Sequence, residues 1–249
     1  LFGFFYSYIY GLTGISLKSL LVAFSFYFLY IFLCIIKLNK LMNDSTPDWV
    51  DNSLKYIITK KQNVSNTSKL LHITLGSLWI NQNYLLYCDW KHLESNLDKL
   101  INEIQKTNIK FDAIVGIKSG GALLCNYIAK KMNIKKYYIK ISKNKYNCNK
   151  SSLNVVNDII DIHIDMNNKY TICEEIKDNI KGQKIILIDE LISTGDTIYH
   201  TMEYLKNVKK VSYVLPTTIC LFEDRFRYDF YNICITKNKY IIWPWGYEN

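Results

Sequence analysis

Two adjacent carboxylates and a hydroxyl-rich turn carry the clearest chemical signal in the sequence. Asp189 and Glu190 follow four apolar residues, and a turn begins after the next two residues, Leu191 and Ile192. The turn residues are Ser193, Thr194, Gly195, Asp196 and Thr197. The carboxylates suit the two hydroxyls of a ribose, directly or through Mg²⁺ and water. Backbone amides and the positive end of a helix dipole suit a phosphate monoester. The segment therefore predicts a sugar-phosphate site.

A second loop with anion-binding character lies earlier in the chain, directly after the apolar run FDAIVGI (111–117). It consists of Lys118, Ser119, Gly120 and Gly121. Two consecutive glycines let backbone amides turn towards an anion, as they do in phosphate-binding loops. Taken alone, these residues are better explained as a plain turn between a strand and a helix.

Strands and helices must alternate to bring these two loops together. The expected strands cover 84–88, 111–117, 137–141, 183–189, 211–222 and 231–235. The expected helices cover 90–107, capped by Asp89, then 122–132 and 196–207. Strand–turn–helix alternation predicts an α/β fold with a mostly parallel sheet flanked by helices. Open sheets of this kind bind ligands at the carboxyl ends of their strands.

The string IILIDELISTGDTI (185–198) resembles the phosphoribosyl pyrophosphate (PRPP) motif of type I phosphoribosyltransferases. That motif has four apolar residues, two acids, a variable segment and Thr-Gly-x-Thr. The resemblance implies a type I fold with a small C-terminal hood. It also implies transfer of a phosphoribosyl group from PRPP to a nucleobase, with Mg²⁺ as cofactor. By the same resemblance, Asp189 and Glu190 hold the ribose and Mg²⁺, residues 193–197 the 5′-phosphate, and residues 118–121 the pyrophosphate.

The C-terminal stretch DFYNICITKNKYIIWPWG (229–246) is similar to the end of bacterial-type xanthine-guanine phosphoribosyltransferases. The similarity implies that Tyr240 stacks on the base and that the main chain around Ile241 reads its edge. It implies a supporting role for Trp243-Pro244-Trp245 and a 6-oxopurine as the base. Ordinary core packing is the alternative for these aromatic residues. The resemblance covers residues 84–246.

Three positions depart from the family pattern. Ser193 stands where many members have an acid that handles a proton of the purine, and serine alone is no general base. Leu221 stands where purine enzymes have a lysine, although Arg225 is close by in the sequence. Ser119 replaces the arginine of xanthine-guanine enzymes. These departures leave open a non-catalytic protein that binds PRPP or a nucleotide in a regulatory role.

The N-terminal region divides into an apolar segment (1–41) and a polar linker or arm (42–78), ahead of the expected catalytic domain (79–249). Residues 19–36 are uncharged and are followed by Lys37 and Lys40. This pattern is compatible with a membrane-spanning helix whose C-terminal side faces the cytoplasm. Translated upstream sequence is the other interpretation. The seven cysteines have no Cys-x-x-Cys pair, which favours a reduced, cytoplasmic chain.

The net charge is +9, and no acidic residue lies between Asp112 and Asp158. Nine lysines fall in that interval, which suits either a polyanionic ligand or a solvated lysine-rich face. No nucleic-acid-binding module is recognisable, and no nucleic-acid partner is expected. The polar stretch 142–172 is a candidate lid. A homo-oligomer is expected, and the four histidines show no metal-binding spacing.

Overall fold

The computed structural model describes most of the chain in separate ranges. These are residues 17–43, 46–55, 58, 85–118, 120–142, 161–164, 171–174, 176–221, 234–235 and 240–247. The chain forms two compact units, residues 1–44 with 64–82 and residues 45–63 with 83–249. The second unit holds both predicted loops.

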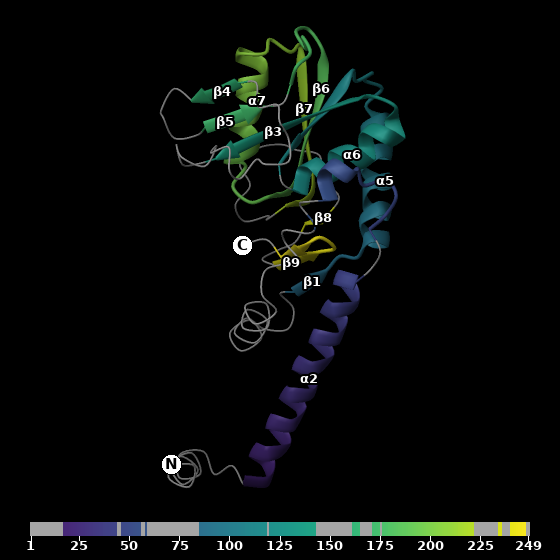
Figure 1. Ribbon diagram of the computed structural model, residues 1–249, viewed down its shortest axis with the longest axis vertical. Coiled ribbons are helices and arrows are strands. Elements are labelled where there is room, and N and C mark those ends of the chain that lie inside the picture. Colours follow the sequence, from purple (N-terminus) through teal and green to yellow (C-terminus); the bar gives the residue numbers. More distant parts are fainter. Residues whose placement is uncertain are drawn as a thin grey trace. The chain divides into compact units, whose positions relative to one another are not determined.

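A seven-stranded sheet is the frame of the second unit (Figure 1). In spatial order its strands are β4 (Asp161–Ile164), β5 (Thr171–Glu174), β3 (Lys135–Ser142), β2 (Ala113–Ile117), β6 (Lys184–Ile192), β7 (Tyr213–Leu221) and β8 (Cys234–Ile235). Strands β3, β2, β6, β7 and β8 pair in parallel, whereas β5 is antiparallel to both of its neighbours. The expected mostly parallel sheet is confirmed.

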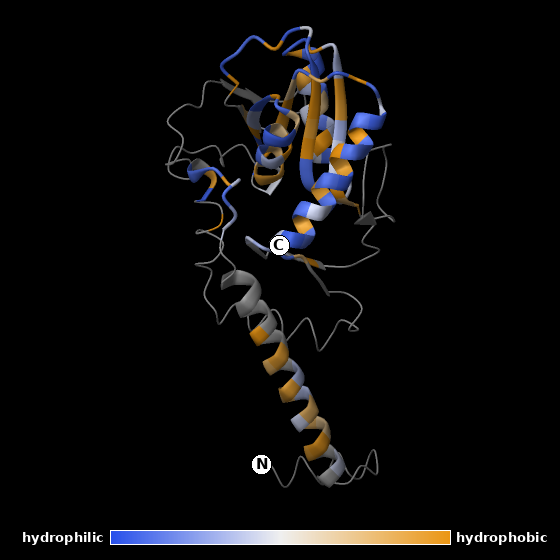
Figure 2. Cartoon of the chain, turned by 90° about the vertical axis from the view of Figure 1, so that its right-hand side faces the viewer, coloured by the Kyte–Doolittle hydropathy of each residue, from blue (hydrophilic) through white to orange (hydrophobic). Residues whose placement is uncertain are grey.

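Helices cover both faces of this sheet. Helices α5 (Trp90–Lys106) and α6 (Gly120–Met132) share one hydrophobic core, and α7 (Asp196–Asn207) belongs to the core on the other face. Figure 2 shows apolar strands and helices that carry both polar and apolar residues. Helix α5 begins as predicted, because the Asp89 carboxylate accepts a hydrogen bond from the His92 N–H at 2.7 Å. Its buried face repeats at helical spacing.

A second, three-stranded sheet joins the two ends of the predicted catalytic domain. Strand β9 (Tyr240–Trp243) pairs in parallel with β1 (Leu85–Tyr87) and antiparallel with β10 (Gly246–Tyr247). The rings of Trp243 and Trp245 stack with centroids 5.1 Å apart, and both side chains are buried. The C-terminal strands thus form the expected small hood, with β1 as an additional member.

Two parts of the sheet differ from the sequence-based expectation. Strand β6 does not end at Asp189 but continues to Ile192, because Leu191 and Ile192 pair with Cys220 and Leu221 of β7. The segment 142–172 contains strand β4 and the start of strand β5, and these two strands pair with each other. The rest of this candidate lid lies outside the described residues.

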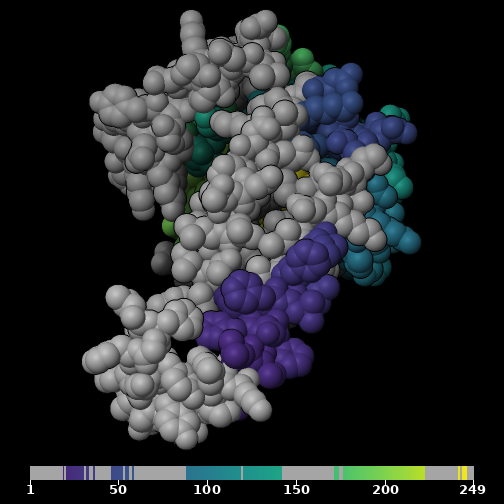
Figure 3. Space-filling view, turned by 60° about the horizontal axis from the view of Figure 1, so that its bottom comes forward, coloured from purple at the N-terminus to yellow at the C-terminus, as the bar shows by residue number. Residues whose placement is uncertain are grey.

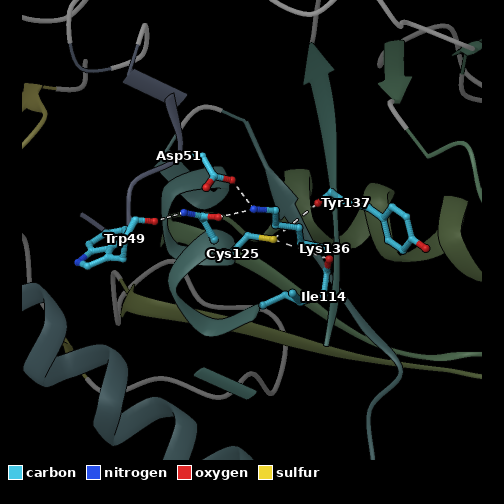
Figure 4. Close-up of polar contacts among 7 residues, drawn as sticks. Trp49, Asp51, Ile114, Cys125, Lys136 and Tyr137 are labelled. Carbon is cyan, nitrogen blue, oxygen red and sulfur yellow. Dashed lines mark hydrogen bonds and ion pairs between the residues drawn. The ribbon is translucent and has the colours of Figure 1, made fainter. Parts of the chain in front are cut away.

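Residues 46–55 and 58 of the predicted linker pack against the predicted catalytic domain (Figure 4). Val50, Leu54 and Ile58 are buried in the core that α5 and α6 share, and Asn52–Leu54 forms a short 3₁₀ helix. The Asn126 side chain of α6 donates a hydrogen bond to the carbonyl of Trp49. Residues 46–55 and 58, which we call the arm, are therefore part of the folded body.

Trp49 connects the arm to two helices. Its indole N–H donates to the Glu94 carboxylate of α5 at 2.7 Å. Its ring makes edge-on contacts with Trp90 at 5.6 Å and Tyr127 at 5.0 Å between centroids. Trp90 in turn lies 5.9 Å from Trp245 of the hood sheet. A continuous set of aromatic contacts thus runs from the arm to the hood.

Helix α2 (Leu17–Asn43) belongs to the first unit and exposes large apolar side chains, among them Phe26 at 68% and Phe28 at 67%. Figure 3 shows its described residues in purple at the surface. Among the residues that the structure describes, no helix combines the length and apolar character required to span a bilayer. The membrane-spanning helix expected over 19–36 is therefore not supported.

The cysteines do not all match the expectation of a reduced chain. Cys88, Cys125 and Cys220 are buried thiols, whereas Cys173 of β5 is disulfide-bonded. The expectation is wrong at Cys173, because spacing along the sequence does not show which sulfur atoms meet in space.

Candidate active site

The two predicted loops meet at the point where the chain changes direction across the sheet. Strands β2 and β6 are parallel neighbours, but β2 leads through α6 to β3 on one side and β6 leads through α7 to β7 on the other. The N-termini of α6 and α7 therefore start from adjacent strand ends on opposite faces of the sheet (Figure 1). Such a switch point is where open α/β sheets bind ligands.

The start of α6 lies directly against the carboxylates of β6. A Cβ atom added to Gly120 would come 2.4 Å from Cδ of Glu190, and one added to Gly121 would come 2.6 Å from the carbonyl oxygen of Ile188. The same Cβ on Gly121 would lie 3.3 Å from Oδ1 of Asp189. Only glycine allows this approach. The predicted pyrophosphate loop and the acidic pair therefore form one site.

The two carboxylates have different surroundings. Glu190 is 5% exposed and points to the α6 face of β6, where it meets the first residue of that helix. Asp189 is half-buried, and its Oδ1 accepts a hydrogen bond from the Glu190 N–H at 3.0 Å. Successive residues of a strand face opposite sides of the sheet. Asp189 is therefore the more accessible of the two.

The turn after β6 is a helix N-terminus of the predicted kind. Gly195 caps α7 with a left-handed backbone (φ 79°), which explains why glycine is needed there. Ser193, Thr194, Asp196 and Thr197 are all half-buried around it. The Asp196 N–H contacts the Thr194 hydroxyl at 3.4 Å. The turn presents amides and hydroxyls at the positive end of α7, as an anion site requires.

The predicted nucleobase residues are only partly described. Tyr240 begins β9, Ile241 is buried in the core under α5 and α6, and Pro244 is buried with its flanking tryptophans. The side chain of Tyr240 lies outside the described residues, as do Arg225 and Ser119. The burial of the tryptophan pair fits both a supporting role and ordinary core packing.

Two neighbours of predicted site residues were not found from the sequence. Thr218 of β7 is fully buried and lies opposite Asp189 in the register of β6 and β7. The Nζ atom of Lys118 lies 5.7 Å from the centre of the Tyr138 ring of β3. Consecutive threonines in the apolar strand YVLPTTICL were the available signal for Thr218, but nothing local to Tyr138 indicates its partner.

Several lysines of the acid-free interval are paired with carboxylates from other segments. The pairs are Lys131 with Asp98 (3.4 Å), Lys135 with Asp178 (3.0 Å) and Lys136 with Asp51. The Tyr137 hydroxyl and Lys135 hold the pKa of Asp178 below its usual value, because both donate hydrogen bonds to the carboxylate. These contacts favour a solvated face over a polyanion-binding surface.

Cys125 of α6 follows the predicted pyrophosphate loop (118–121) by about one helical turn, and its thiol is buried. Its sulfur contacts the carbonyl oxygens of Ile114 and Tyr137, each at 3.7 Å (Figure 4). Burial raises the pKa of this thiol to about 12, so it stays protonated at neutral pH. Its Cβ lies where a side chain at Gly116 would stand, which fixes α6 close to β2.

No cluster of three metal-ligating side chains occurs among the described residues. Mg²⁺ does not need one, because it keeps several waters and binds through one or two carboxylates together with substrate phosphates. The half-buried carboxylate of Asp189 beside the two predicted anion-binding turns fits that mode of binding. Any magnesium here would therefore be held jointly with a phosphorylated substrate.

A protein-family model establishes the class of this chain. The phosphoribosyl transferase domain model matches residues 86–247, which include both turns, the acidic pair and the hood strands. The chain belongs to the phosphoribosyltransferase family. The arm lies outside this match, although it packs into the same core.

Individual relatives are distant. The purine phosphoribosyltransferase from Pyrococcus horikoshii superposes with a TM-score of 0.51 at 15% identity, covering 66% of this chain and 96% of that one. The Helicobacter pylori xanthine-guanine-hypoxanthine phosphoribosyltransferase gives 0.47 at 14% identity, covering 66% and 94%. The similarity to the Pyrococcus horikoshii enzyme shows a shared fold and nothing more.

Among curated proteins, the transcriptional regulator GfcR of Methanococcus maripaludis is 24% identical over 139 residues. The match covers 52% of this chain and 59% of the regulator, so the chain spans about three-fifths of its length.

Proposed function

We propose that this protein transfers the 5-phosphoribosyl group of PRPP to a nucleobase, and that the base is a 6-oxopurine. The observation that carries the proposal is the packing of the first turn of α6 against Asp189 and Glu190 at the switch point. This brings two helix N-termini and an accessible carboxylate to one sheet edge, as a doubly phosphorylated sugar requires. The oxopurine is supported by the similarity of residues 229–246 to xanthine-guanine enzymes.

The proposed roles divide the substrate among the elements. Residues 193–197 would bind the 5′-phosphate, and Asp189 and Glu190 would hold the ribose. Residues 118–121 would bind the pyrophosphate. Tyr240, Ile241 and Arg225 would face the base. Mg²⁺, held by Asp189 and substrate oxygens, would neutralise charge on the departing pyrophosphate.

In the proposed reaction, one bond at C1 of the ribose breaks and another forms at the same atom. The bond from C1 to the pyrophosphate oxygen breaks with both electrons going to pyrophosphate, and a bond from C1 to a base nitrogen forms. The base loses one ring proton as this bond forms. Ser193 is no general base by itself, so the proton passes to solvent in this protein. Fixed donors around the departing pyrophosphate supply most of the rate enhancement.

The direct test is nucleotide formation by the full chain. PRPP and Mg²⁺ are incubated with guanine, xanthine, hypoxanthine, adenine, orotate or uracil, and the products are separated by chromatography. We expect a mononucleotide from at least one 6-oxopurine. Asp189→Asn is the control for a contaminating enzyme. Absence of product from all six bases would contradict the proposal.

A regulatory protein that binds PRPP or a nucleotide without turnover is the second candidate. The observations that favour it are the match to transcriptional regulators and the serine at position 193. Calorimetry separates the two candidates, because the regulator would bind PRPP but form no product. The expected homo-oligomer remains a prediction, to be checked by light scattering.

A further inference from the structure

A cation–π contact lies at the end of the site where pyrophosphate would bind. The Nζ atom of Lys118 lies 5.7 Å from the centroid of the Tyr138 ring. Lys118 directly follows β2, and Tyr138 lies in β3, opposite Gly116 in the register of the two strands. The face of an aromatic ring attracts an ammonium group within about 6 Å. The two side chains therefore interact across neighbouring strands.

Both partners are held in place by the fold. Tyr138 is partly buried and packs against the core that α5 and α6 share with the sheet. The Lys118 N–H donates to the carbonyl of Ile139 at 2.8 Å, which fixes the backbone of the lysine beside β3. Side chains two residues apart on a strand share a face, so Lys118 projects on the side of Gly116, which α6 covers.

We infer that Tyr138 is a positioning residue whose ring holds the Lys118 ammonium group at the pyrophosphate end of the site. This inference rests on the proposed function. A lysine side chain loses rotamer freedom when a ligand orders it. A ring that orders the side chain beforehand lowers that loss and tightens binding. Tyr138 would thus act on affinity for the pyrophosphate moiety and not on the bond exchange at C1.

The inference is tested by calorimetry of the full chain with inorganic pyrophosphate and Mg²⁺, without a nucleobase. We expect Tyr138→Leu to raise the Kd about threefold to tenfold. Tyr138→Phe keeps the ring and should bind like the unmodified protein. In the Lys118→Met background, Tyr138→Leu should have no further effect. Tyr138→Met, which fills a similar volume, replaces Tyr138→Leu if leucine prevents folding.

A matched control exists at the other end of α6. The Nζ atom of Lys131 lies 5.3 Å from the centroid of the Tyr127 ring, in a similar pair away from the switch point. Lys131→Met should leave the Kd for pyrophosphate unchanged. In turnover assays, Tyr138→Leu should raise KM for PRPP at constant kcat.

The other possible results contradict either the inference about Tyr138 alone or the proposed function as well. An unchanged Kd for Tyr138→Leu overturns the inference, and so does an equal loss with and without Lys118, because the ring would then be merely structural. No binding of pyrophosphate by the unmodified protein would overturn the proposed function as well. Binding of pyrophosphate that is insensitive to Tyr138 leaves the proposed function standing.

Discussion

The glycines at the start of α6 are buried by close packing, whereas most residues of the turn between β6 and α7 are half-exposed. Gly120 and Gly121 are buried against Glu190 and the backbone of β6. In the second turn only Gly195 is buried, and the hydroxyl-bearing residues around it remain accessible. Substitutions of Gly120 or Gly121 should therefore disturb folding, and substitutions in the second turn should mainly disturb ligand binding.

Gly121→Ala should have the largest effect. The added Cβ would come 2.6 Å from the carbonyl oxygen of Ile188 and 3.0 Å from Cα of Asp189, and neither backbone atom can move without disturbing the sheet. Overpacking of this kind costs up to about 3 kcal/mol. For a domain of this size that lowers the Tm by about 6 to 12 °C in a thermal scan.

Gly182→Ala is the control for the loss of a glycine as such. Gly182 has a φ of 78° and open space around its Cα, so alanine there introduces backbone strain without a collision. It should cost about 1 kcal/mol. Equal Tm values for the two variants would mean that α6 does not lie against β6 as described.

The two carboxylates should respond differently to neutralisation. Asp189→Asn should lower the rate of nucleotide formation on the order of 100-fold with little change in Tm, because the side chain is half-buried and faces the proposed ligand. Glu190→Gln should lower the Tm by about 2 to 4 °C, since a buried carboxylate beside the first turn of α6 is stabilised by the helix dipole.

Assays of rate and Tm on the same preparations distinguish these effects. If both variants lose activity equally and neither melts earlier, the Glu190 carboxylate does not stabilise the start of α6, and the contrast between Asp189 and Glu190 is wrong.

A substitution in the second turn, at Ser193, should raise the rate of nucleotide formation. Ser193→Asp restores the acid that many family members carry before Thr-Gly, and the position is half-buried and accessible. If proton removal from the base limits turnover, kcat should rise about tenfold, a fraction of what general bases contribute. Ser193→Asn is the matched control and should give no gain. A rise with both variants would show that charge is irrelevant at this position.

The sequence predicts those elements whose signals are local. Helix α5 begins after Asp89 and buries one apolar face as expected, because the cap and the helical period both lie within the segment. The acidic pair and both turns could be predicted for the same reason, because each is defined by residues within one short segment. Their meeting at a switch point follows once the strands are taken as parallel.

Long-range contacts explain what the sequence did not show. Leu191 and Ile192 extend β6 only because β7 lies beside them. Val50 and Leu54 become core residues only because α5 and α6 supply a surface for the arm. The contact between Lys118 and Tyr138 depends on the register of β2 and β3, which no local pattern encodes.

Of the substitutions in the two turns, Thr194→Val should change the Tm least. It therefore separates an effect on ligand binding from an effect on stability. The hydroxyl of Thr194 lies 3.4 Å from the Asp196 N–H, a long contact whose loss should cost about 0.5 kcal/mol. The Tm should therefore fall by about 2 °C or less. Binding of PRPP should weaken more than the Tm suggests, because the same hydroxyl is a proposed donor to the 5′-phosphate.

Thr194→Ser keeps the hydroxyl and should restore PRPP binding, measured by calorimetry. A large drop in Tm for Thr194→Val with unchanged PRPP affinity would reverse the assignment. It would mean that the turn before α7, like the two glycines at the start of α6, is constrained by packing, and that its hydroxyls serve the fold and not the ligand.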